Sequence, residues 1–137
     1  MTEPLMRTIN RYNEVVPENL EQLDELLHPD YKHLTPPTGM TPTREGIKSY
    51  FRMVDMAIGD FRFNVKDTLI DGNKVVQRWT ITGTHEGEFL DIPASGKEVE
   101  FDGISILELR DGKIYRDATI ADTMSLMQQI EAVPALG

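Results

Sequence analysis

Cysteine is absent from the chain. The sequence therefore excludes disulfides, thiolate metal sites and a thiol nucleophile. Histidine is scarce, and His28, His33 and His85 do not form a short-spaced pair of metal ligands. The glycine-rich signatures of dinucleotide and phosphate binding and the G-x-S-x-G motif of serine hydrolases are also missing. We therefore expect no metal site and no cofactor.

Positive charge is in short supply. The chain has 14 lysines and arginines against 23 aspartates and glutamates, which gives a formal net charge of −9. Such a surface repels phosphate backbones and anionic lipid headgroups, which argues against nucleic-acid and membrane-surface roles. No apolar run approaches the roughly 20 residues of a membrane-spanning helix. The polar residues 1–12 show no secretory signal, so we expect a cytoplasmic protein.

The pattern of apolar residues divides the chain into a helical part and a strand part. The length of 137 residues predicts one domain over residues 1–137. Apolar residues recur at helical spacing in residues 5–16 and 20–27, on either side of Pro17, and again in residues 44–58. The spacing then changes to the alternation of half-buried strands. The predicted strands cover residues 61–66, 74–84, 97–109 and 113–121.

This order of elements predicts the fold class. Helices come first, an antiparallel meander follows, and a short helix after Asp122 closes the chain. Segregated helices over such a meander are typical of an α+β fold. A strongly curved sheet wrapped by helices forms a cone with an open end, which is a natural pocket for a small molecule.

The last predicted strand supplies a candidate acid–base group. Ile114 and Ile120 mark one side of this strand as facing the core, and Asp122 shares their parity. A carboxylate at the mouth of the cone would be desolvated, so that its pKa rises and it can exchange protons near neutral pH. Asp122 also stands where the N-cap of the closing helix is expected. Both interpretations remain open, and one residue could serve both roles.

Two histidines are candidate partners of this carboxylate. His85 follows Trp79 and Ile81 on the same parity, so it would orient a substrate carbonyl or hold a proton. The alternative for His85 is a loop histidine bonded to backbone. His33 follows the second predicted helix and either reaches the rim of the pocket or is solvated.

Apolar and aromatic side chains are expected to bind the substrate. The predicted lining consists of Tyr12, Tyr50, Phe51, Val54, Trp79, Ile81, Ala118 and Ile120. On the opposite face of the sheet, Arg78, Thr80, Thr82 and Thr84 form a polar surface. That surface is either solvated or the interface of a dimer, and we expect a homodimer.

Several segments resemble one family. The run Arg78–Gly87, RWTITGTHEG, resembles the RWTxxGTHxG segment of SnoaL-like polyketide cyclases. These proteins are also called ester cyclases and belong to the NTF2-like, ketosteroid-isomerase-like superfamily. The segment Ile92–Lys97 is similar to the IPPTGK loop of the family, and Tyr31-Lys32-His33 matches its Y-x-H signature. The segment Asp122–Gln129 resembles its closing D-x-x-x-L-x-x-Q helix.

The resemblance implies a fold and a chemistry. The fold would be an NTF2-like cone, and the acid–base aspartate of the family would fall on Asp122, with His33 and His85 as polar helpers. Family cyclases close a ring of a polyketide-like molecule by intramolecular aldol condensation, without metal or cofactor. Two positions depart from the family: Ala118 stands where a tryptophan is frequent, and Asp91 replaces a glycine.

The same cone is compatible with other functions. Relatives in the superfamily open epoxides, isomerise ketosteroids or support hydroxylation, and an inward aspartate can serve each reaction. A non-catalytic small-molecule carrier or a dimerisation module is a further alternative.

Overall fold

A computed structural model describes residues 3–89 and 91–131. The helices are α1 (Glu3–Val15), the 3-10 helix η1 (Leu20–Gln22), α2 (Leu23–Leu26), α3 (Arg44–Ala57) and α4 (Thr123–Gln129). The strands are β1 (Leu27–His33), β2 (Ile58–Asp71), β3 (Lys74–His85), β4 (Glu98–Arg110) and β5 (Lys113–Ala121).

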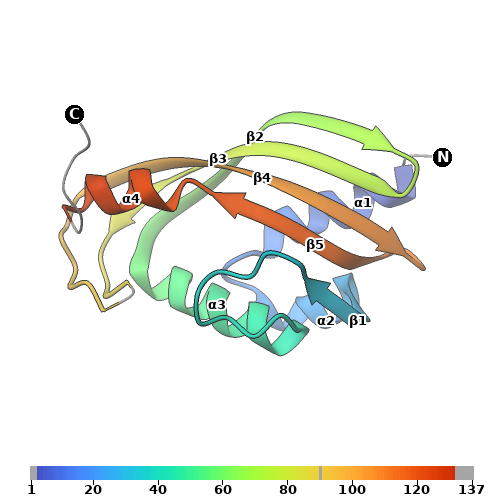
Figure 1. Cartoon of the computed structure of the whole chain (residues 1–137), viewed down its shortest axis with the longest axis horizontal. Coiled ribbons are helices and arrows are strands. Elements are labelled where there is room, and N and C mark those ends of the chain that lie inside the picture. The colour runs from blue at the N-terminus through green and yellow to red at the C-terminus, as the bar shows by residue number, and fades with distance from the viewer. Residues whose placement is uncertain (1–2, 90, 132–137) are drawn as a thin grey trace.

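The strands form one mixed sheet in the order β1-β5-β4-β3-β2. Strands β2 to β5 are an antiparallel meander, and β1 lies parallel to β5. Figure 1 shows α1, α2 and α3 on one side of the curved sheet and α4 at the end of β5. The predicted α+β class, with N-terminal helices packed on a strongly curved sheet, is confirmed. No described helix combines the length and apolar character needed to cross a membrane.

The first strand, β1, was not predicted from the sequence. The pattern of residues 20–27 predicted a helix, but the helical segment ends at Leu26 and Leu27 already begins a strand. Pro29 cannot continue a helix, and proline is tolerated in an edge strand such as β1. His33 consequently stands at the end of a strand instead of in a solvated loop.

An extra residue in β5 changes which side chains face the helices. Leu109 pairs with Ile114 and Glu108 pairs with Arg116, so Tyr115 has no partner on β4 and forms a β-bulge. Because side chains alternate between the two faces of a strand, one extra residue reverses every later position. The prediction that Ile120 shares the core-facing side of Ile114 is therefore wrong: Ile114 is buried, and Ile120 is 67% exposed.

Gly103 on β4 makes room for the only tryptophan of the chain. It pairs with Trp79 across the two strands, and the six-membered part of the indole ring occupies the space that a side chain at position 103 would take. A Cβ atom on Gly103 would lie 2.2 Å from Cη2 of Trp79. The missing side chain thus lets the indole ring lie against β4, with its Nε1 2.9 Å from the hydroxyl of Ser105.

We predict that Gly103→Ala lowers the free energy of unfolding by about 1–3 kcal/mol, the usual cost of overpacking a core. Urea denaturation followed by circular dichroism measures the change. Trp79→Phe provides the matched background, because the smaller ring leaves space for the added methyl group. An equal cost of Gly103→Ala in the Trp79 and Phe backgrounds would show that this contact is not the reason for the glycine.

Candidate active site

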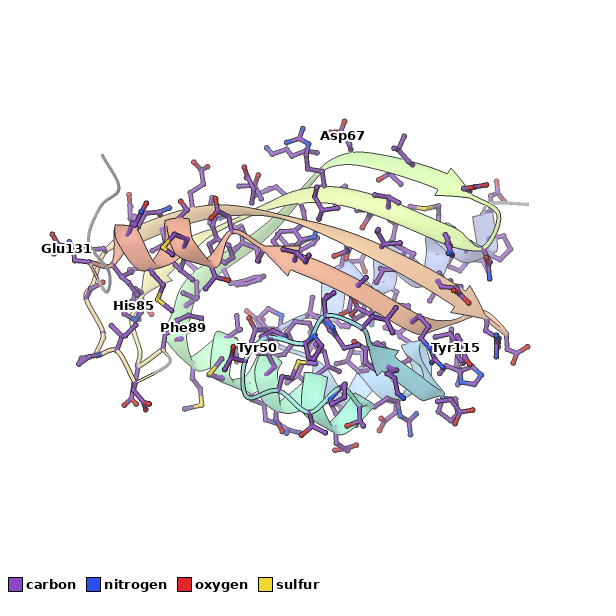
Figure 2. The ribbon with its side chains drawn as sticks, viewed as in Figure 1. Tyr50, Asp67, His85, Phe89, Tyr115 and Glu131 are labelled. Carbon is purple, nitrogen blue, oxygen red and sulfur yellow. The ribbon has the colours of Figure 1, made fainter. Side chains whose placement is uncertain are left out.

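A cavity of about 270 Å³ lies between the inner face of the sheet and helices α1 and α3. Its volume is close to the lower end of the range for small-molecule sites. Figure 2 shows Phe89 toward the end of the molecule that carries α4, and Tyr115 at the opposite end. Eight aromatic side chains contribute to the wall: Tyr12, Tyr50, Phe51, Phe61, Phe63, Trp79, Phe89 and Phe101.

One carboxylate, that of Asp117 on β5, lines this cavity and is almost fully buried, at 2% exposed. The hydroxyl of Tyr31 donates to its Oδ2 at 2.7 Å, and the hydroxyl of Thr119 bonds to its Oδ1 at 2.5 Å. Nε2 of His33 lies 3.9 Å from Oδ1, beyond hydrogen-bond distance. The bulge at Tyr115 explains this position, because it turns Asp117 and Thr119 inward.

Two tyrosines near Asp117 stay protonated and can act as hydrogen-bond donors. Burial raises the pKa of Tyr31, and the neighbouring Asp117 carboxylate raises it further. Burial and the charge of Asp117 likewise raise the pKa of Tyr12 well above its usual range. Both phenols therefore keep their protons at neutral pH.

His33 is held neutral and in one tautomer. Its Nδ1 accepts the backbone N–H of Thr35 at 3.1 Å, so the ring proton resides on Nε2, the nitrogen nearer to Asp117. Burial lowers the pKa of His33, and the opposing attraction of the Asp117 carboxylate is the smaller effect. The ring at neutral pH is thus an uncharged N–H donor beside the carboxylate.

Amide side chains form a second polar group in the cavity wall. Asn13 on α1 donates from Nδ2 to Oε1 of Gln77 at 2.9 Å, and Gln77 donates from Nε2 to the hydroxyl of Thr68 at 3.2 Å. Gln77 is 2% exposed, and both Asn13 and Gln77 line the cavity. Their contacts hold the two amides in defined orientations, so each can present a remaining polar atom to a ligand.

The structure places Asp122 outside the cavity. Its side chain is exposed and accepts the backbone N–H of Ser125 at 3.0 Å, which makes it the N-cap of α4. The N-cap interpretation is confirmed, and the prediction that Asp122 points inward is wrong. The reason is the bulge at Tyr115, which the alternation counted from Ile114 does not include.

His85 is fully buried at the end of β3 but does not line the cavity. Its Nδ1 accepts the backbone N–H of Ser95 at 3.2 Å and lies 2.9 Å from the hydroxyl of the same residue. Among the described residues, Nε2 of His85 has no hydrogen-bond partner. Figure 2 shows the residue near the end that carries α4. Its contacts fix the loop between β3 and β4.

The predicted lining residues are not all brought together. Ala118 pairs with Ile106 on the outer face of the sheet and does not line the cavity. Ile120 contributes only from the rim, because most of its surface is exposed. The others contribute to the wall: Tyr12, Tyr50, Phe51, Val54, Trp79 and Ile81.

Sequence reasoning missed the polar wall. Its members are Asn13, Gln77, Ser105, Asp117 and Thr119. The only available signal was the Y-x-H pattern of Tyr31 and His33, whose side chains converge on Asp117. No three His, Asp or Glu side chains in residues 3–89 and 91–131 are arranged to hold a metal ion.

We predict that His33 makes the fold less stable in mild acid. Its folded-state pKa lies below the unfolded value of about 6.5, so the unfolded state binds more protons between these two values. The neutral His33 ring therefore costs no stability above about pH 6.5, and the free energy of unfolding falls as the pH drops from 6.5 toward the folded-state pKa. His33→Asn, whose side-chain oxygen can accept the Thr35 N–H, removes this dependence. Urea denaturation at pH 7.5, 6.5 and 5.5 measures it, and identical pH slopes for both proteins would contradict the assignment.

Known proteins resemble the chain in sequence and fold. A family model described as SnoaL-like polyketide cyclase matches residues 6–130. No curated protein matches significantly. TsrD from Streptomyces laurentii is 27% identical, with a TM-score of 0.85 over 95% of this chain and 96% of TsrD. IdmH, a candidate polyketide cyclase from Streptomyces antibioticus, is 28% identical, with a TM-score of 0.80 over 94% of this chain and 99% of IdmH.

A third structure shares the fold. A candidate polyketide cyclase from Bacillus cereus is 24% identical, with a TM-score of 0.84 over 96% of this chain and 83% of its own. The resemblance to the family that the sequence predicted is thus confirmed, and it extends over residues 6–130. The chain belongs to the SnoaL-like polyketide cyclase family.

Proposed function

We propose that the chain is an acid–base enzyme of the polyketide-cyclase type and that Asp117 is its general base. The observation that supports this role most strongly is the position of the carboxylate, buried in the cavity wall among uncharged donors. Tyr31 and Thr119 orient the carboxylate, and His33 stays neutral beside it. Asp117 takes the place that the family resemblance assigned to Asp122.

The reaction begins with removal of a proton from a carbon between or beside carbonyl groups. The C–H electron pair becomes an enolate, and the proton passes to the Asp117 carboxylate. The enolate carbon attacks a second carbonyl carbon of the same molecule, which forms the new C–C bond and leaves an alkoxide. The alkoxide takes the proton back from Asp117, so the product is an isomer of the substrate and the enzyme is regenerated.

The wall of the cavity favours a flat, conjugated ligand. Aromatic rings cover the apolar part of the wall, and the polar groups gather around Asp117, Ser105 and Gln77. A polycyclic or polyketide-like molecule would place its apolar rings among the aromatic side chains and its carbonyl oxygens at the polar wall. The neutral phenol of Tyr12 can donate to an oxygen on which negative charge develops.

We predict that the wild-type protein accelerates exchange of the C1 hydrogens of 2-tetralone in D₂O, which proton NMR follows. This bicyclic ketone has an activated C–H bond and fits an aromatic cavity. Asp117→Asn should lower the catalysed rate by about 10²–10⁴-fold, the usual contribution of a general base. Asp122→Asn, a matched change five positions away, should leave the rate unchanged because Asp122 is exposed.

Two outcomes would count against this assignment. Full exchange activity in Asp117→Asn would remove Asp117 from the mechanism. If instead 2-tetralone quenches the fluorescence of Trp79 but its hydrogens do not exchange, the cavity binds without catalysis and the carrier alternative holds.

We propose in addition that a second copy of the chain packs on the outer face of the sheet. Apolar side chains form a strip there: the exposed Leu69 pairs with the half-buried Val76, Val76 pairs with the exposed Ile106, and the exposed Ile104 and Ile120 pair with each other. Arg78 and Asp67 stand beside the strip as a 2.7 Å ion pair, so a twofold axis could bring opposite charges together.

We expect the protein to be a dimer in light scattering and Ile104→Lys with Ile106→Lys to convert it to a monomer. Met56→Lys is the control, because Met56 is 77% exposed on α3, away from the strip. A monomeric wild-type protein, or a dimer that survives the double substitution, would contradict the proposed interface.

A further inference from the structure

A row of hydrogen bonds crosses the inner face of the sheet and ends at Asp117. Nε1 of Trp79 on β3 donates to the hydroxyl of Ser105 on β4 at 2.9 Å. The Ser105 and Thr119 hydroxyls are 2.9 Å apart, on paired positions of β4 and β5. Thr119 in turn contacts Oδ1 of Asp117. Trp79, Ser105 and Asp117 are buried, and Thr119 lines the cavity.

The ends of the row fix the direction of its protons. The indole nitrogen can only donate, and an ionised carboxylate can only accept. Thr119 has one hydroxyl proton, which must go to ionised Asp117. The bond between Ser105 and Thr119 then needs the proton of Ser105. With Asp117 ionised, every donor in the row therefore points toward the carboxylate.

Protonation of Asp117 reverses part of this row. The carboxylic acid donates from Oδ1 to Thr119, and Thr119 turns its proton to Ser105. Ser105 then accepts hydrogen bonds from both Thr119 and Trp79, so its own hydroxyl proton no longer donates to Thr119. Because Ser105 lines the cavity, this proton can turn toward a ligand. No heavy atom has to move between the two states.

We propose that Thr119 and Ser105 form a reversible hydrogen-bond relay that fits both protonation states of Asp117. When Asp117 carries the substrate proton, the relay presents the Ser105 hydroxyl to the ligand, at the moment when an enolate oxygen needs a donor. Thr119 is a positioning residue, Trp79 anchors the far end, and Ser105 donates to the ligand. The relay rests on the role proposed above for Asp117.

The other titratable groups around Asp117 do not take part in the hydrogen bonds that connect its Oδ1 to Trp79. The titratable groups that face the carboxylate are Tyr31 and His33 on β1 and Tyr12 on α1. Tyr31 bonds to Oδ2, the oxygen that the relay does not use, and His33 lies beyond hydrogen-bond distance of Oδ1.

Asp117→Asn provides a fixed imitation of the protonated state. The hydroxyl of Tyr31 donates to Oδ2, so the amide oxygen of the asparagine takes that place. Its NH₂ group then faces Thr119, where the carboxylic acid would carry its proton. The variant should hold the relay in the reversed direction at any pH.

The indole ¹H–¹⁵N resonance of Trp79 reports the direction of the relay, and it is unambiguous because the chain has one tryptophan. We expect Asp117→Asn to shift this resonance in the wild-type background and in Thr119→Ser, which keeps the hydroxyl. In Thr119→Val the response should vanish. Asp122→Asn, the matched loss of one charge, should not move the resonance. An equal response to Asp117→Asn with and without the Thr119 hydroxyl would overturn the relay.

The exchange of 2-tetralone separates this inference from the proposed function. Ser105→Ala should lower the turnover rate about tenfold at unchanged KM, the effect of one lost hydrogen bond in the transition state. If Asp117→Asn abolishes exchange while Ser105→Ala leaves it intact, the relay is wrong and the general base stands. If Asp117→Asn has no effect on exchange, the proposed function itself fails.

Discussion

The extra residue in β5 controls the chemistry of the cavity. Without the bulge at Tyr115, the alternation of the strand would send Arg116, Ala118 and Ile120 toward the helices and Asp117 toward the outer face. With it, Ile114 still contributes to the core below the bulge, while Asp117 and Thr119 line the cavity above it. One insertion thus lets a single strand build a hydrophobic core at one end and a polar site at the other.

A buried carboxylate imposes requirements on its surroundings. Removing it from water is costly unless donors replace the lost hydration. Tyr31 from β1 and Thr119 from β5 supply these hydrogen bonds, and Ser105 on β4 and Trp79 on β3 extend the row across the sheet. Gly103 belongs to the same arrangement, because the space above its backbone admits the indole ring. Residues from four neighbouring strands, β1, β5, β4 and β3, therefore contribute to the surroundings of the Asp117 carboxylate.

The spacing of apolar residues along the sequence, helical in the first part and alternating in the second, was sufficient to predict the fold class. The meander was predictable because its strands alternate, and because two of its three connections carry an Asp-Gly pair, Asp71-Gly72 and Asp111-Gly112. Strand β1 was not, since Leu27, Tyr31 and His33 are too few to distinguish a short edge strand from the end of a helix. The sequence predicted that Asp122, and not Asp117, places its carboxylate in the cavity, because a β-bulge leaves no mark in the hydrophobic pattern. The isoleucines Ile104, Ile106 and Ile120 face outward, while Ser105 and Asp117 face inward, which reverses the usual rule.

This reversal keeps the cone open for a ligand. An inner face made only of isoleucine and leucine would fill the cone, and a filled cone binds no ligand. The polar residues Ser105, Asp117 and Thr119 are small and bond to one another, so they line a space without requiring water. The donors around Asp117 are uncharged, and no lysine or arginine of the described chain pairs with it. A strong ion pair would hold the carboxylate in its ionised state, whereas neutral donors whose protons can turn stabilise both states. The geometry that hides Asp117 from water thus fits the proton transfer that we propose for this carboxylate.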